Sequence, residues 1–354
     1  MVSGGDRPVV LSSPGIVQST AVTPPLGIDI HAHFFPESYL RIIEKEGAAA
    51  GARIDRSNPA GIGIVIGGVS TPPLGPAYWD LDTRLKAMNR SGVGVQALSL
   101  TTPMVYFAGA ALGRRLAQAF NDACAEAHTA HPDRFVGCAT LPMQDPALAI
   151  AELERAARLP GIRAVYLGTN VNGRELSDTA YTPLFERCQE YELPVLLHPI
   201  NVVGASRLAP FYLSNLLGNP FDTAIAAAHL VLGGVLDRFP RLQVCLPHAG
   251  GAMPYLFGRL QHGQRVRPEA RDRARRPFSA YLRRFTYDTI SHSPEALRYL
   301  IGLVGADRVM LGSDFCFDMG YERPRDIVTK RLGLKAADQA RIIRGNAARL
   351  LGLA

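Results

Sequence analysis

The first residues of this chain that could do chemistry are two histidines near its start. Residues 27–33, Gly-Ile-Asp-Ile-His-Ala-His, form an apolar run that ends in His31-x-His33. Because side chains alternate along a strand, His31 and His33 point to the same face. Two imidazoles placed in this way can bind one metal ion. The alternative is an inert, hydrogen-bonded pair, and the positions of the other histidines and aspartates decide between the two.

Other histidines also follow apolar runs. His198 ends one such run, His248 follows another, and Asp314 comes directly after the last one, in Gly312-Ser313-Asp314. The remaining histidines fall in predicted helices or surface turns, where we expect structural or solvated side chains: His128, His131, His229, His262 and His292.

The elements that must position these residues repeat regularly along the chain. Apolar runs predict eight strands, at residues 27–33, 93–100, 135–139, 162–167, 195–198, 242–246, 285–288 and 308–312, with helical patterns between them. Nearly continuous apolar strands are typical of a parallel sheet that is covered on both faces. Eight such units predict an α/β fold, a closed (β/α)8 TIM barrel. An open doubly wound sheet is the alternative, but no GxGxxG motif follows the first strand to favour it.

In a barrel of this kind the catalytic residues stand at the carboxyl ends of the strands. The rule brings the four strand-end histidines and Asp314 to one barrel mouth. Three imidazoles and a carboxylate suit a single divalent ion with positions open for water and substrate. Such an ion lowers the pKa of its water, and the spare imidazole could accept the proton.

Composition limits the classes of function. The chain is 47% apolar and 19% charged, as in a globular protein, with a formal net charge of +7. Much of the excess lies in the arginine run of residues 265–284, which we interpret as a solvated helix face. The run lacks the aromatic interleaving and motifs of nucleic-acid binding, whereas an anionic substrate fits the charge. Five widely spaced cysteines predict free thiols in a reducing compartment.

The chain is predicted to form one barrel domain, residues 26–354. Residues 1–25 are rich in Ser, Pro, Gly and Thr and are expected to be a flexible tail without a secretion signal. No apolar run is long enough to span a membrane, so we expect no membrane partner and a cytoplasmic location. The glycine-rich residues 47–79 are predicted to be a loop inserted near the active-site mouth.

These motifs together resemble the amidohydrolase superfamily, and most closely its aminocarboxymuconate semialdehyde decarboxylase (ACMSD)-like family. The resemblance runs from Gly27 to Leu353 and rests on His31-x-His33, His198-Pro199, His248-Ala-Gly-Gly, Gly312-Ser-Asp314, Gly92–Ser99, Arg134–Gly137, Thr140–Gln144, Gly258-Arg259 and Gly345–Ala347. It implies that one divalent ion, zinc ahead of manganese, is held by His31, His33, His198 and Asp314. It also implies that His248 is the unligated histidine that works on the metal-bound water.

The resemblance extends to substrate contacts. Arg259 stands where the family places an arginine that reaches a neighbouring subunit's substrate carboxylate, which implies a homodimer. Phe317 stands where an aromatic ring packs on the substrate, and Tyr212 where the resembled decarboxylase has a tryptophan. No lysine is present in Leu167-Gly168-Thr169, which favours a mononuclear site over the binuclear hydrolases of the superfamily.

One departure from the family concerns the substrate. A second carboxylate-binding arginine is expected shortly before Trp79-Asp80, where this chain has Ser70-Thr71-Pro72-Pro73-Leu74. Arg53 and Arg56 are the substitutes that the preceding loop offers. Pro210 and Asn215 also replace more aromatic residues. A ring or dienoic carboxylic acid other than the aminocarboxymuconate semialdehyde would fit the altered pocket.

We therefore expect a metal-dependent, non-oxidative decarboxylase of an unsaturated or aromatic carboxylic acid, a carbon–carbon lyase without an organic cofactor. The first alternative is a hydrolase or hydratase of the same fold that acts on a ring-cleavage product and releases no carbon dioxide. The second is a non-catalytic barrel with a structural metal, which would have no need of a fifth strand-end residue such as a spare histidine.

Overall fold

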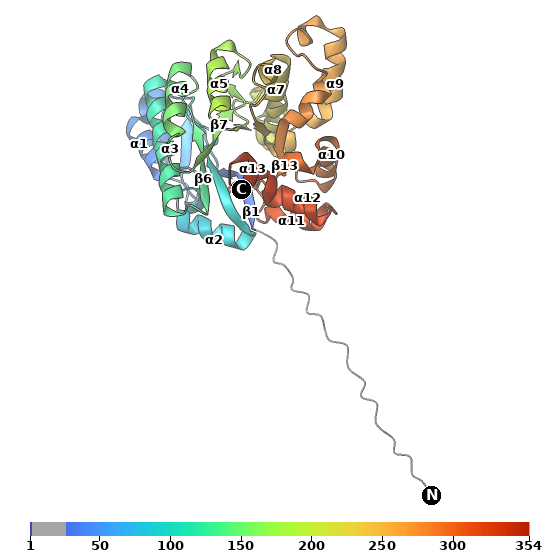
Figure 1. Cartoon of the computed structure of the whole chain (residues 1–354). Helices are drawn as coiled ribbons and strands as arrows, with labels where there is room; N and C mark the ends of the chain where they lie inside the picture. Colours follow the sequence, from blue (N-terminus) through green and yellow to red (C-terminus); the bar gives the residue numbers. More distant parts are fainter. Residues whose placement is uncertain (2–25, 354) are drawn as a thin grey trace.

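Eight parallel strands form a barrel at the centre of the chain (Figure 1). The computed structural model describes Met1 and residues 26–353, so the predicted tail over residues 1–25 lies, apart from Met1, outside the described residues. The strands are hydrogen-bonded in the order β1 (Gly27–His33), β5 (Val93–Ser99), β6 (Phe135–Thr140), β7 (Ile162–Gly168), β10 (Val195–His198), β11 (Val244–Leu246), β12 (Phe285–Asp288) and β13 (Val309–Met310).

The last strand closes the barrel against the first. The Ile30 amide donates a hydrogen bond of 3.0 Å to the Leu311 carbonyl, and Ala32 pairs with Phe315 in a parallel bridge just after β13. The carboxyl ends of all eight strands therefore meet at one mouth. The prediction of a (β/α)8 TIM barrel is confirmed, and the open sheet is excluded.

Helices surround this barrel, and consecutive ones pack on each other, as α3, α4 and α5 do along one flank (Figure 1). The helices are α1 (Glu37–Glu46), α2 (Leu81–Ser91), α3 (Ala110–Ala130), α4 (Pro146–Ala156), α5 (Thr182–Glu190), α6 (Ala205–Leu208), α7 (Asn219–Leu232), α8 (Val235–Arg238), α9 (Met253–Val266), α10 (Pro294–Val304), α11 (Pro324–Asp326), α12 (Ala336–Ala340) and α13 (Asn346–Leu350). Within residues 26–353, no helix combines the length and hydropathy needed to cross a bilayer.

Side-chain caps explain where several helices start. The Asp80 carboxylate accepts hydrogen bonds from two backbone amides of the first turn of α2, and Asp145 does the same for α4. The Ser293 hydroxyl accepts one from the first turn of α10. Short polar side chains at this position satisfy amides that have no partner within the helix.

The inserted residues 47–79 contain a small antiparallel sheet of their own. It consists of β2 (Ala52–Asp55), β3 (Gly63–Ile66) and β4 (Val69–Ser70), and a second small hairpin pairs β8 (Asn170–Val171) with β9 (Arg174–Glu175). The sheet buries Ile64 against the main core. Glycines and short runs hide this regular structure in the sequence pattern.

The arginine run does not form the helix that the sequence predicted. Residues 268–270 and 278–284 form separate short 3-10 turns, with irregular backbone between them. Pro268 opens the first turn, and Pro277 directly precedes the second. A proline lacks the backbone N–H that a continuous helix needs. The arginines at 267, 271, 273, 275 and 276 are exposed, so the prediction of a solvated face is confirmed.

A buried arginine ties the first strand to the structure behind it. Arg84, on α2, is fully buried and donates hydrogen bonds to Gln96 Oε1, at 2.9 Å, and to the His33 carbonyl. Gln96 in turn donates to Asp29 Oδ2 at 3.2 Å. Burial raises the pKa of Asp29 to about 6, although hydrogen bonds from Ser313 and other groups oppose the shift. This chain of contacts fixes the end of β1 from behind.

Removing the Arg84 side chain is predicted to destabilise the whole barrel. Arg84→Ala leaves a cavity and unpaired polar groups, and we expect it to lower the free energy of unfolding by about 3 kcal/mol. The half-exposed Arg115, paired with Glu46, is the matched control, and Arg115→Ala should cost less than about 1 kcal/mol. Urea unfolding of the two variants measures the difference. Equal losses would show that the buried network contributes no more than a surface pair.

Candidate active site

Three histidines and one aspartate converge where β1, β10 and the segment after β13 meet. Ligand atoms of His31, His33, His198 and Asp314 all lie within 4.8 Å of one another, and all four residues are buried. The Nε2 atoms of His31 and His33 are 3.1 Å apart, and Asp314 Oδ1 lies 2.9 Å from His33 Nε2 and 3.6 Å from that of His31. These residues come from strand ends that are far apart in the sequence, as the barrel rule predicts.

The Asp288 carboxylate, at the end of β12, orients two of the site's histidines. Its Oδ2 accepts a hydrogen bond of 2.8 Å from His31 Nδ1 and one of 3.0 Å from the His248 backbone amide. Its Oδ1 accepts the amides of Ala249 and Ile290 at 2.8 and 3.0 Å. Because Nδ1 of His31 is engaged, the His31 ring presents Nε2 to the cluster.

His198 is tethered in a similar way. Its Nδ1 lies 2.9 Å from the Pro199 carbonyl, and the Thr101 hydroxyl lies 3.1 Å from both ring nitrogens. If Nδ1–H donates to the carbonyl, Nε2 carries no proton and its lone pair can bind a metal ion.

Burial and neighbouring charges shift the pKa values of the cluster in different directions. Burial lowers the pKa of His33 to about 4 and that of His198 well below its usual range. Burial also opposes a charge on His31, but the hydrogen bond with Asp288 and the charge of Asp314 outweigh it, so the pKa of His31 is raised. Burial favours a protonated Asp314, yet His248, His33 and His31 hold its pKa well below the ordinary value.

His248 stands on a strained turn after β11. The backbone of both His248 and Ala249 is left-handed, with φ of 53° and 54°, and two glycines with positive φ follow. A Cβ on Gly250 would meet the Tyr287 ring at 2.8 Å, and one on Gly251 would meet the Pro220 carbonyl oxygen at 2.2 Å. The turn thus requires the two glycines of the His-Ala-Gly-Gly motif, and backbone strain like that at His248 and Ala249 concentrates at functional sites.

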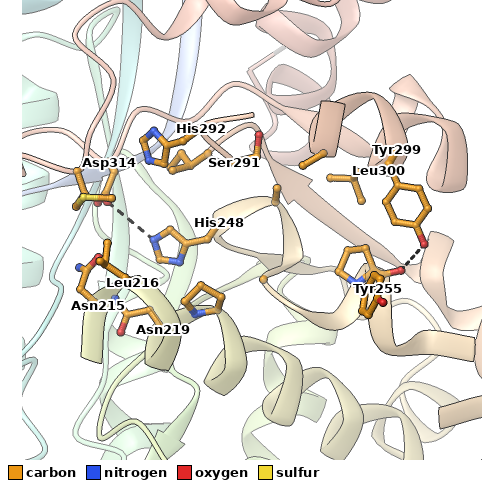
Figure 2. Close-up of a pocket in the computed structure, with 17 residues that line it drawn as sticks. Asn215, Leu216, Asn219, His248, Tyr255, Ser291, His292, Tyr299, Leu300 and Asp314 are labelled. Carbon is orange, nitrogen blue, oxygen red and sulfur yellow. Dashed lines mark hydrogen bonds and ion pairs between the residues drawn. The ribbon is translucent and has the colours of Figure 1, made fainter. Parts of the chain in front are cut away.

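The turn aims the His248 ring into a cavity beside the cluster. His248 Nε2 lies 3.9 Å from Asp314 Oδ2, and both residues line a cavity of about 510 Å³ (Figure 2). Its wall also includes Asn215 and Asn219 near α7 and Tyr255 and Tyr299 from α9 and α10. The size suits a small organic acid.

The structure brings some of the other predicted site residues to this region and leaves one outside it. The Phe317 ring packs on His33, with 5.4 Å between the ring centroids. Tyr212 is half-exposed, and burial together with Asp318 and Asp314 raises its pKa. Arg259 is exposed on α9 and does not belong to the cavity wall of its own chain, as that wall is formed by the described residues.

The structure also shows where Arg53, Arg56 and His292 lie. Arg53 and Arg56, the substitutes for the missing arginine, are mostly exposed and pair with Asp55 and Glu44 on the surface. His292 is exposed, as predicted, and it also lines the cavity together with His248 and Asp314. It lies in the loop directly before α10, on the side of the barrel mouth.

Sequence reasoning also missed the role of Asp288. The signal was present, since Asp288 ends a predicted strand at the same barrel mouth as the histidines. Thr101, two residues beyond β5, obeys the same rule. Neither belongs to a recognisable motif, so only the contacts reveal what they orient.

The donor set fits one divalent ion. Bonds of about 2.1 Å to a shared ion place donor atoms about 3–3.5 Å apart, close to the separations of the His31, His33 and Asp314 atoms. Two imidazoles with lowered pKa values are neutral at neutral pH, as ligands must be. The fixed orientations imposed by Asp288 and Pro199 are those that metal-binding histidines usually have.

Comparison with known proteins identifies the family. The Amidohydrolase family model matches residues 28–353, and the chain belongs to this family. It is 33% identical over 332 residues to 2-amino-3-carboxymuconate-6-semialdehyde decarboxylase of Dictyostelium discoideum, covering 93% of this chain and 92% of the relative. It is 32% identical over 293 residues to gamma-resorcylate decarboxylase of a Rhizobium species, covering 77% and 87%.

Solved structures agree with this assignment. IDCase of Metarhizium anisopliae in its apo form superposes with a TM-score of 0.82 at 26% identity, covering 93% of this chain and 97% of that one. The dihydroxybenzoic acid decarboxylase of a Polaromonas species, with bound manganese and the inhibitor 2-nitroresorcinol, gives a TM-score of 0.76 at 25% identity, covering 93% and 97%. The predicted resemblance to the amidohydrolase decarboxylases is confirmed.

Asp288 provides a test of how the site is held. We expect Asp288→Ala to weaken divalent-metal affinity by about 10- to 100-fold, because His31 loses the acceptor that orients its ring. The helix cap Asp145 is the matched control, and Asp145→Ala should lower stability by about 1 kcal/mol without changing metal affinity. Competition titration with a zinc chelator measures both. Unchanged affinity in Asp288→Ala would mean that the ring is oriented by packing alone.

Proposed function

We propose that this protein is a metal-dependent, non-oxidative decarboxylase of an unsaturated or aromatic carboxylic acid, and thus a carbon–carbon lyase. The observation that carries the proposal is the His/Asp cluster beside His248, at the mouth of an amidohydrolase barrel. The relatives named above are decarboxylases of such acids. They also weigh against a hydrolase or hydratase.

The residues divide into two roles. A divalent ion would be held by His31, His33, His198 and Asp314. When bound, the ion supplies a Lewis acid that activates water and stabilises negative charge on a substrate oxygen. His248 takes a proton from water and donates it to the substrate carbon that bears the carboxylate. The bond from that carbon to the carboxylate then breaks, its electron pair restores the conjugated system, and carbon dioxide leaves.

Zinc is our proposal for the ion, with manganese second. A donor set rich in imidazole suits zinc. The manganese in the related dihydroxybenzoic acid decarboxylase supports the second choice. No organic cofactor is needed for the reaction. The five free cysteines support a reducing, cytoplasmic compartment.

We also propose that residues 26–354 act as one domain in which residues 47–79 cover part of the mouth. The Tyr78 ring lies 5.3 Å, between centroids, from the Phe317 ring, which in turn packs on His33. The inserted segment thereby contacts an aromatic residue that we propose packs on the substrate, and Tyr212 is proposed to act beside it.

A homodimer is the last part of the proposal. Eight large apolar side chains are exposed on α9, α10, α7 and the segment before α7: Val203, Phe211, Tyr212, Leu216, Leu217, Phe221, Tyr255 and Tyr299. Three of them, Leu216, Tyr255 and Tyr299, line the cavity. Apolar surface of this kind usually marks a protein interface. Arg259 lies one helical turn after Tyr255 on α9, so a second copy seated here would receive this arginine. A guanidinium can bind a substrate carboxylate through two parallel hydrogen bonds.

The reaction is tested by carbon dioxide release. The purified protein should contain about one divalent ion per chain and release carbon dioxide from 2,6-dihydroxybenzoate or from the aminocarboxymuconate semialdehyde. His248→Ala should keep the ion and lose turnover by about 10²-fold or more, the usual contribution of an acid–base group. Metal analysis and headspace gas measurement report the two properties separately. Loss of the ion from His248→Ala would make His248 a ligand.

Arg259 is tested by mixing chains. Arg259→Ala should bind metal normally and bind the substrate poorly, and His248→Ala should be inactive. In a mixed dimer one of the two sites regains both groups, so random exchange should restore about a quarter of wild-type activity. Inactive mixtures with exchange confirmed by mass spectrometry would place Arg259 outside the partner's site.

A further inference from the structure

His292 is the one histidine of the cavity wall that the proposed mechanism does not use. It lies in the loop between β12 and α10, and it lines the cavity with His248 and Asp314 (Figure 2). In that view the His292 ring lies on the Asp314 side of the cavity, and Asn215 and Asn219 lie across from it, beyond His248. The ring is exposed to solvent, so a ligand in the cavity can reach it.

The position of His292 is fixed by Tyr321. The His292 backbone is left-handed, with φ of 55°, and its amide donates a hydrogen bond of 2.7 Å to the Tyr321 hydroxyl. The two rings also pack on each other in a tilted arrangement, with centroids 4.8 Å apart and planes inclined by 40°. Tyr321 is itself anchored, because its amide donates to the Ser313 carbonyl at 2.7 Å, next to Asp314. The imidazole is therefore placed relative to the metal cluster before any ligand arrives.

The cavity has few other groups that could bind an oxygen substituent. Among the described residues of its wall there is no lysine or arginine. The Tyr299 hydroxyl donates to the Pro254 carbonyl at 2.8 Å, and the Ser291 hydroxyl to that of Ser293 at 2.9 Å. Besides His248, the imidazole of His292, the Tyr255 hydroxyl and the amides of Asn215 and Asn219 are left as donors.

We infer that His292 is a specificity-determining residue whose imidazole N–H binds a second oxygen substituent of the acid, beyond the group bound at the metal cluster. The inference rests on the proposed function for the class of ligand. It identifies the substrate class further, as a conjugated carboxylic acid that carries another carboxylate, hydroxyl or carbonyl oxygen. Tyr321 is then a positioning residue that acts through His292.

Two substitutions separate the hydrogen bond from the ring packing. His292→Phe keeps a ring for Tyr321 but has no N–H, whereas His292→Asn keeps an N–H and readily adopts the left-handed backbone. Calorimetry on the metal-loaded full chain should compare benzoate with 2,6-dihydroxybenzoate and benzene-1,3-dicarboxylate. We expect the wild type to bind at least one substituted acid about tenfold more tightly than benzoate, the contribution of one good hydrogen bond.

In His292→Phe that preference should fall to within about twofold, while in His292→Asn it should stay within about threefold of the wild-type value. Benzoate affinity should stay the same in both variants. Tyr321→Phe, which loses only the hydroxyl, should reduce the preference partly. His131→Asn, just before β6 at the opposite end of the barrel, is the matched histidine control and should leave it unchanged.

Three results would overturn the inference. They are a wild-type protein without preference for either substituted acid, an unchanged preference in His292→Phe, and equal losses in the Phe and Asn variants, which would assign the effect to packing. Thermal unfolding of each variant, compared with the wild type, checks that the barrel is intact. Because the readout is binding, absence of carbon dioxide release would reject the proposed reaction while these affinity ratios still decide the role of His292.

Discussion

The site depends on the hydrogen bonds that the buried carboxylate of Asp288 accepts. It accepts the ring N–H of His31 and the backbone amides of His248, Ala249 and Ile290. One side chain thereby joins the ends of β1, β11 and β12 and sets both the direction of a cluster imidazole and the strained turn that carries His248. The four donors around this carboxylate replace the hydrogen bonds to water that it loses on burial. The barrel closure between β1 and β13 brings Asp314 to the same point.

Much of this arrangement could be predicted from the sequence, because it follows from periodicity and strand ends. The eight strands, most helices and the convergence of His31, His33, His198, His248 and Asp314 all follow from apolar runs and one barrel rule. The small sheet in residues 52–70 could not be predicted, since its short strands are separated by glycines and show little alternation. The helix expected through the arginine run fails because Pro268 and Pro277 interrupt it.

The roles of Asp288, Thr101 and His292 were hidden for a different reason. A motif records residues that are close in sequence, whereas these three act through contacts with β1, β10 and the loop after β13. Their types are also ambiguous: a loop histidine such as His292 is usually solvated, and only its place in the cavity wall makes it a binding group. Arg84 is a comparable case, since a helix arginine rarely has its charge buried between Gln96 and a strand carbonyl.

The electrostatics of the cluster explain why such a crowded set of histidines is compatible with a stable fold. Three imidazolium ions within a few ångströms would repel one another strongly, but burial keeps His33 and His198 neutral, as their lowered pKa values show. Only His31, which faces the carboxylates of Asp288 and Asp314, favours its proton. The cluster therefore offers an incoming divalent ion two neutral imidazoles and an ionised aspartate already in place. Folding pays the cost of assembling the ligands, and the metal then binds a site whose charge already complements it.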